Sequence, residues 1–168
     1  MLSLPGQRVL PGETGLITPA AVRAVPILAA SLLALAVSQA GAAGTFEDQG
    51  ELDYVLHCSG CHRPDGYGVA SGGIPPVTDQ IGYFLTVPEG RAFLMQVSGL
   101  LNAGLSDKRA AGVTNWMIRT FAGASMPREF LPLTANEARR YRLARPADIA
   151  GTRKAIAGKL IEAGYPIK

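Results

Sequence analysis

The fragment HCSGCH, residues 57–62, contains both cysteines and both histidines of this chain of 168 residues. Four side chains that bind metals or cofactors therefore lie within six positions. This cluster constrains the fold, because the rest of the chain has to enclose whatever these side chains hold. A zinc ion, a redox-active dithiol and a covalently attached cofactor are the three candidates, and each requires different surroundings.

Zinc and a dithiol both fit the remaining sequence poorly. A structural zinc site takes four tetrahedral ligands, usually two from each of two chain segments. No cysteine or histidine occurs outside residues 57–62, and neighbouring residues on a helix point in different directions. A thioredoxin-like CxxC begins a helix in a βαβ setting, whereas this sequence shows helical patterns and no long run of alternating apolar and polar residues.

Covalent haem attachment accounts for every residue of the C-x-x-C-H motif. Cys58 and Cys61 are about one helical turn apart, so each thiol can form a thioether with one haem vinyl group. The histidine that follows is then delivered beneath the iron. The sequence therefore predicts one covalently bound haem c, with thioethers from Cys58 and Cys61 and with His62 as the proximal ligand.

Residues 1–42 are predicted to be a signal peptide. No charged residue occurs from Ala24 to Thr45, and the stretch VPILAASLLALAV behind Arg23 has the composition of a signal-peptide core. Small residues follow it and predict cleavage near Ala42. The leader before Arg23 is unusually long, which leaves the start codon open. Cleavage predicts a periplasmic protein, and membrane attachment is expected only if the leader stays uncleaved as an anchor of roughly 20 residues.

The remainder of the chain predicts an all-α fold. Helical signals cover residues 46–62, 88–99, 105–121, 133–146 and 148–163, and a segment rich in glycine and proline at 63–82 predicts a loop. Three capping signals mark helix ends. Ser106 is placed as an N-cap, Thr134 and Glu137 have the spacing of a capping box, and Gly164 follows the last helix.

Charge divides the chain into two parts. Residues 43–107 contain two basic and eight acidic residues, whereas residues 108–168 contain twelve basic and four acidic residues. This separation predicts either a dipolar molecule that steers its partner or, if folding mixes the two parts, no net dipole. The basic residues are not interleaved with aromatic residues, so no nucleic acid partner is expected.

Several stretches together resemble class I c-type cytochromes. Tyr54 precedes CSGCH by four residues, CHRPDGYG and GIPPV follow it, and a helix, a Met-Pro pair and a second helix come later. The resemblance covers about residues 46–145. It implies a small cytochrome c-like helical domain, residues 43–146, wrapped around one covalently bound haem. Residues 147–168 are then a basic C-terminal helix that packs on this domain or extends it.

The resemblance also implies roles near the proximal ligand. The carbonyl of Pro75 or Pro76 is expected to accept a hydrogen bond from the ring N–H of His62, which fixes the imidazole and raises its basicity. Trp116 is expected either to bind a haem propionate through its indole N–H or to serve as a buried structural residue.

The sixth iron ligand is predicted to be a methionine. His57 is tethered to the proximal side by the neighbouring thioether, which leaves Met95, Met117 and Met126. Met126 is favoured, because it stands in a loop before Pro127 and because SMP resembles the distal segment of the family. The segment VSGLLNAGLSD resembles a family loop that has lost its methionine, so a five-coordinate iron is the alternative.

These expectations predict an electron carrier and not an enzyme. By resemblance, its partners are a periplasmic dehydrogenase as donor and an oxidase or another cytochrome as acceptor. Two alternatives stay open: a haem subunit fixed in a larger dehydrogenase complex, and a haem enzyme or gas sensor with an open distal site.

Overall fold

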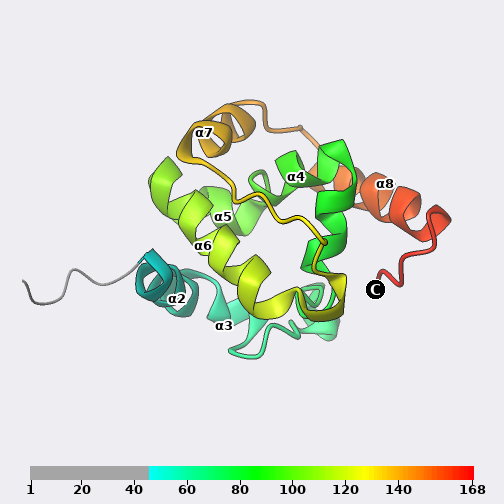
Figure 1. Ribbon diagram of the computed structural model, residues 1–168, viewed down its shortest axis with the longest axis horizontal. Coiled ribbons are helices and arrows are strands. Elements are labelled where there is room, and N and C mark those ends of the chain that lie inside the picture. The colour runs from blue at the N-terminus through cyan, green and yellow to red at the C-terminus, as the bar shows by residue number, and fades with distance from the viewer. Residues whose placement is uncertain (1–45) are drawn as a thin grey trace, which may run out of the picture. The chain divides into compact units, whose positions relative to one another are not determined.

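The computed structural model describes residues 46–168, so the predicted signal peptide and its cleavage site lie outside the described residues. Within this range the chain forms helices and no strand, as Figure 1 shows. The α-helices are α2 (Phe46–His57), α3 (Ser59–His62), α4 (Pro88–Leu94), α5 (Ser98–Asn102), α6 (Asp107–Phe121), α7 (Ala135–Leu143) and α8 (Ile149–Glu162). The 3-10 helices are η2 (Ala70–Gly72), η3 (Ile81–Thr86) and η4 (Gly123–Ser125). The predicted all-α class is confirmed.

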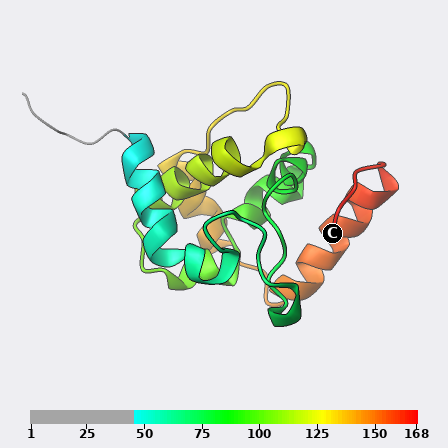
Figure 2. The same ribbon diagram turned by 90° about the horizontal axis from the view of Figure 1, so that it is seen from below.

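Helix α2 packs along α6 (Figures 1 and 2). A Cβ atom added to Gly50 on α2 would lie 2.6 Å from the Cβ of Trp116 on α6, so the two helices approach closely at this point. Tyr54, one turn further along α2, is only 1% exposed. Its ring centroid lies 5.1 Å from the centroids of both Trp116 and Phe121. This aromatic group fixes the start of the CSGCH motif against α6.

Two predicted helices are each divided in the structure. The helix predicted over residues 46–62 is broken at Cys58. The φ angle of Cys58 is −123°, which lies outside the helical region, although its ψ angle of −37° is helical. The helix predicted over 88–99 ends at Leu94, and α5 starts after the extended residue Val97. Buried Gln96 donates hydrogen bonds of 3.0 Å to the carbonyls of Tyr141 and Ala144 at the end of α7, which holds the turn.

The predicted helix caps are confirmed. The Ser106 side chain accepts a hydrogen bond from the backbone N–H of Arg109 at the start of α6. Thr134 and Glu137 form both hydrogen bonds of a capping box at the start of α7. Gly164 follows α8 with a φ angle of +86°, a conformation that favours glycine.

Residues 147–168 attach to the body of the fold through a hydrophobic cluster of their own. Ile156 and Leu160 on α8 are buried against Phe84 of η3 and Phe93 of α4. The larger cluster, which includes Tyr54, lies between α2, α6 and the segments around α5 and α7. The basic C-terminal helix therefore packs on the side of the fold formed by η3 and α4 (Figure 2).

Folding mixes the two oppositely charged parts of the chain. Of the five ion pairs among residues 46–168, four join an acidic or basic residue of 43–107 to one of 108–168. These four pairs are Asp53–Arg109, Arg91–Glu137, Asp107–Arg142 and Glu89–Lys159. The structure thus favours mixing over a simple dipole. Among residues 46–168, no helix has the length and apolar character needed to cross a membrane.

Candidate functional site

The CSGCH motif lies at the junction of α2 and α3. Cys58 is the N-cap residue of α3, and its carbonyl accepts hydrogen bonds from the backbone N–H groups of Cys61 and His62 at 3.1 and 2.9 Å. This short turn places both thiols and the imidazole on one compact unit. Cys58 is half-buried against the core, whereas Cys61 is exposed. Neither cysteine forms a disulfide.

His62 carries an unsatisfied polar atom. Its Nδ1 is buried and has no hydrogen-bond partner among the described residues. Burial lowers the pKa of His62, whereas the Pro75 carbonyl raises this pKa by a smaller amount. Within the described residues no hydrogen bond joins the imidazole to Pro75, although the Pro75 carbonyl is the neighbour that raises the pKa of this ring. Because a buried N–H normally has a partner, the Pro75 carbonyl would be the acceptor for Nδ1 if Nε2 held a metal.

The chain after His62 folds back so that Pro75 can come close. The backbone N–H of Gly68 donates to the His62 carbonyl at 3.0 Å. Gly68 has a φ angle of +66°, and an added Cβ would lie 2.5 Å from the Ile74 oxygen and 2.7 Å from the Pro75 oxygen. Only glycine fits at this approach. The Tyr54 hydroxyl donates to the Arg63 carbonyl, which ties the same loop to α2.

The structure weakens both alternatives to haem. Burial, followed by the charge of Asp53, raises the pKa of the Cys58 thiol to about 11. A redox-active CxxC depends on a lowered thiol pKa, so this environment does not suit dithiol chemistry. Within the described range, no three residues among His, Cys, Asp and Glu gather in a group able to hold a metal ion. A zinc tetrahedron therefore does not form there.

The donor set does fit a covalently attached haem. Two unpaired thiols lie one helical turn apart on a single unit, the histidine follows directly, and its second nitrogen lacks only a partner that Pro75 can supply. The structure thus brings Cys58, Cys61, His62 and Pro75 together.

The three candidate methionines have different environments. Met95 is fully buried, and Met117 is 9% exposed; both belong to the main hydrophobic cluster. Met126 directly follows η4 and is 37% exposed. The structure therefore assigns core packing to Met95 and Met117, and Met126 remains the methionine that is not used in the core. Its role as sixth ligand stays a prediction.

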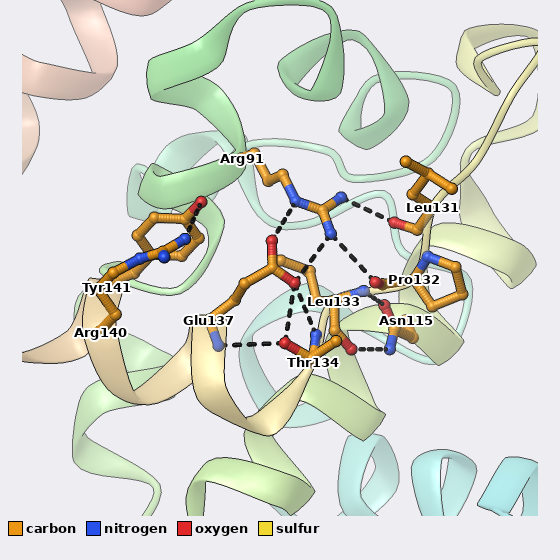
Figure 3. Close-up of polar contacts among 9 residues, drawn as sticks. All are labelled: Arg91, Asn115, Leu131, Pro132, Leu133, Thr134, Glu137, Arg140 and Tyr141. Atoms are coloured by element: carbon orange, nitrogen blue, oxygen red, sulfur yellow. Dashed lines mark hydrogen bonds and ion pairs between the residues drawn. The ribbon is translucent and has the colours of Figure 1, made fainter.

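The loop that carries Met126 is held at both ends. Before it, the Ser125 side chain accepts a hydrogen bond from the Gly82 N–H at 3.0 Å. After it, Arg91 donates to the carbonyls of Leu131 and Pro132 at 2.7 and 3.1 Å. Figure 3 shows these contacts of Arg91 together with the two hydrogen bonds between Asn115 and Leu133. Between these anchors, Met126, Arg128 and Glu129 are exposed, whereas Phe130 packs against the main hydrophobic cluster.

Trp116 is half-buried between the rings of Tyr54 and Phe121. Among residues 46–168, none of the hydrogen bonds involves its indole N–H. Packing accounts for its position against Gly50, and its predicted contact with a propionate stays untested. Pro76 lies one residue beyond the carbonyl that raises the pKa of His62, and its predicted hydrogen bond to the imidazole is not among those of the described residues.

Two contributors to the site were missed by sequence reasoning. Gly68 is essential for the approach of Pro75, and its signal was the run of glycines after the motif. Gln80 is buried and binds the backbone of Pro166 and Lys168, 86 and 88 residues away. No local pattern could reveal so distant a contact.

Similarity to known proteins agrees with this site. Cytochrome c-552 of Thermus thermophilus is 26% identical over 117 residues, which cover 58% of this chain and 88% of the relative. Cytochrome c-552 from a named strain of the same species is 26% identical over the same length, with 78% of that protein covered. No protein-family model matches the chain. The fold is all-α and cytochrome c-like.

Proposed function

We propose that this chain is an exported monohaem c-type cytochrome that carries single electrons between periplasmic proteins. The observation that carries the proposal is the CSGCH unit, in which two unpaired thiols precede a histidine whose buried Nδ1 lacks a partner among the described residues. Haem supplies a reversible one-electron centre when it is bound. The protein supplies attachment, orientation and a helical shell around it.

In this proposal each residue has one task. Cys58 and Cys61 form the two thioethers, and His62 binds the iron through Nε2. Pro75 accepts the Nδ1 proton of His62 in a hydrogen bond and so holds the imidazole in one orientation. Tyr54 and Gly68 hold the two sides of the loop in place.

Covalent attachment is tested by mass spectrometry of protein matured in a host with the c-type haem assembly machinery. The mass of the protein with the natural sequence is expected to exceed the mass of its polypeptide by one haem. The Cys61→Ser variant keeps only one thioether, and its pyridine haemochrome band is expected to move to longer wavelength. A colourless unmodified protein with the mass of the polypeptide alone would falsify the proposal.

We propose Met126 as the sixth ligand. Its exposed position in a loop, the burial of Met95 and Met117 and the adjacent Pro127 support this assignment. In Met126→Ala, the far-red sulfur-to-iron band of the oxidised protein is expected to disappear. Met117→Leu serves as the control and is expected to retain the band. Retention of the band in Met126→Ala moves the assignment to Met95.

An open distal site is the second candidate function, and the anchoring of η4 favours it. The Ala124 N–H donates to the Asp79 carboxylate at 3.0 Å, and the backbone N–H of Asp79 donates to the Phe121 carbonyl at 2.8 Å. These contacts fix η4, which Met126 directly follows, to the segment after Pro75 and so limit how far Met126 can move. Rapid binding of carbon monoxide by the reduced protein at neutral pH supports this candidate and contradicts Met126 ligation.

Export and transient partnership complete the proposal. The predicted cleavage near Ala42 is tested by N-terminal sequencing of the mature protein.

Electron-transfer contacts are small and weak, so the native protein is expected to elute alone from a size-exclusion column. Elution together with a dehydrogenase supports instead the alternative of a fixed haem subunit.

A further inference from the structure

Gln80 joins the end of the chain to the segment that carries Pro75. Its side chain is 6% exposed. The amide Nε2 donates to the Pro166 carbonyl at 3.1 Å, and Oε1 accepts from the Lys168 N–H at 3.0 Å. A buried side-chain amide that satisfies both a carbonyl and an N–H of another segment fixes that segment in one register.

The other side of the proline segment is fixed to the loop after His62. The Val77 N–H donates to the Gly66 carbonyl at 2.8 Å, and the Thr78 hydroxyl donates to the Asp65 carbonyl at 2.6 Å. Close contact of Gly68 with the Pro75 carbonyl completes this attachment. A displacement of residues 75–80 therefore changes the position of the Pro75 carbonyl relative to His62.

The tail, residues 164–168, is itself firmly held. The ring of Tyr165 lies 4.9 Å from that of Tyr83, measured between centroids. Arg153 on α8 donates to the Lys168 carbonyl at 3.1 Å. The tail thus follows α8, whose Leu160 is fully buried.

An open pocket lies between the tail and the two prolines. A space of about 630 Å³ separates Pro75 and Pro76 from Arg153 and Lys168, and Gln80 is part of its lining. The tail therefore does not press on the two prolines directly. The side chain of Gln80 is the hydrogen-bonded link between this segment and the tail, whereas Tyr165 reaches η3 only by packing on Tyr83.

We propose that Gln80 is a positioning residue for the proximal ligand, and that it transmits the docking of residues 147–168 to the Pro75 carbonyl. This inference depends on the proposed function, because it requires His62 to bind the haem iron. A hydrogen bond from the Nδ1–H of His62 to the Pro75 carbonyl would make the imidazole a more basic ligand, which would favour the oxidised iron. Loss of the Gln80 contacts lets the Pro75 carbonyl move away and is expected to raise the reduction potential.

The experiment compares haem-bearing variants of the full chain. Gln80→Ala and a deletion of residues 164–168 both remove the connection, and Gln80→Glu keeps only the acceptor for Lys168. The control is Asp148→Ala, which removes the side-chain acceptor for the Gly151 N–H at the opposite end of α8. The control loosens α8 without touching Gln80. We measure three quantities for each variant: the midpoint potential, the NMR resonance of the His62 ring N–H and the melting temperature.

Gln80→Ala and the deletion are expected to shift the reduction equilibrium a few-fold toward the reduced form, less than the roughly 10–100-fold loss of metal affinity or activity that follows removal of a direct partner of a metal ligand. Both are expected to move the His62 ring resonance, and Gln80→Glu is expected to lie between them and the unmodified protein. Asp148→Ala is expected to melt at a lower temperature with unchanged potential and resonance.

Two results overturn the inference. One is a Gln80→Ala protein that melts at a lower temperature with an unchanged potential. The other is a control that shifts the potential as much as Gln80→Ala does, since the effect would then reflect general loosening. If Gln80→Ala does not fold, Gln80→Glu and the deletion decide between these outcomes. Failure of the unmodified chain to attach haem contradicts the proposed function itself and is recognised by mass before any potential is measured.

Discussion

At the scale of single residues, Arg91 and Glu137 form the most connected ion pair of the described chain. Arg91 Nε donates to Glu137 Oε1 at 2.9 Å, and Nη2 donates to Oε2 at 3.2 Å (Figure 3). The same guanidinium binds the carbonyls of Leu131 and Pro132. Both side chains of the pair are less than a quarter exposed. A planar guanidinium can satisfy a carboxylate and two carbonyls at once, so this arginine links α4, the Met126 loop and α7.

Glu137 makes stability depend on pH. Its hydrogen bond with Arg91, supported by Thr134, lowers the pKa of Glu137 from 4.5 to about 2. A lowered pKa means that the folded state holds this proton less tightly than the unfolded state does. The stabilisation is therefore complete above pH 4.5 and is lost as pH falls toward about 2.

The Glu137→Gln variant is expected to lose about 2 kcal/mol of unfolding free energy at pH 7, since a hydrogen bond to a charged group contributes this much. Its stability is also expected to fall less steeply below pH 4.5. Chemical denaturation at a series of pH values measures both effects. Glu162→Gln, at an exposed glutamate of α8, is the control. Equal pH slopes for Glu137→Gln and the unmodified protein contradict this account.

At the scale of elements, the approach of α2 to α6 decides where the CSGCH motif lies. Glycine at position 50 lets the backbone of α2 lie directly on Trp116. Tyr54 then fills the space between Trp116 and Phe121, and the ion pair of buried Asp53 with Arg109 holds the next point of contact. The motif begins four residues after Tyr54, so its orientation follows from this packing.

Gly50→Ala is expected to destabilise the protein by about 1–3 kcal/mol, because the new methyl group overlaps Trp116 and forces the helices apart. Gly112→Ala is the matched control. Gly112 lies on α6, and a Cβ added there has no neighbour within 4 Å. That variant is expected to gain about 0.5–1 kcal/mol, since alanine favours the helix. Thermal unfolding followed by circular dichroism measures both. A Gly50→Ala protein as stable as Gly112→Ala would show that the contact is not tight.

At the scale of the whole molecule, residues 147–168 behave as part of the described fold and not as a loose extension. Leu160 has no exposed surface, and it packs with Ile156 against Phe84 and Phe93. The ion pair between Lys159 and Glu89 adds a surface contact. Through Gln80, the same region reaches the segment that faces His62.

Leu160→Ala is therefore expected to lower the stability of the whole haem-bearing protein by about 2–5 kcal/mol, the cost of a cavity in a packed core. Leu143→Ala, at a leucine that is 80% exposed, is expected to change little. Helix content and haem absorbance are recorded during the same denaturant titration. One common transition, shifted in Leu160→Ala, is expected. Separate transitions in the unmodified protein would show that α8 folds independently.

The sequence alone determined those features whose signals are local. The C-x-x-C-H spacing, the N-caps at Ser106 and Thr134 and the glycine after α8 each depend on residues within a few positions, and physical rules for short segments cover them. The tertiary structure alone decided the contacts between distant segments. It placed Met95 and Met117 in the core, divided two predicted helices and brought Gln80 to Pro166. Such contacts depend on how whole elements pack against one another, and the spacing of residues along the chain does not predict this packing.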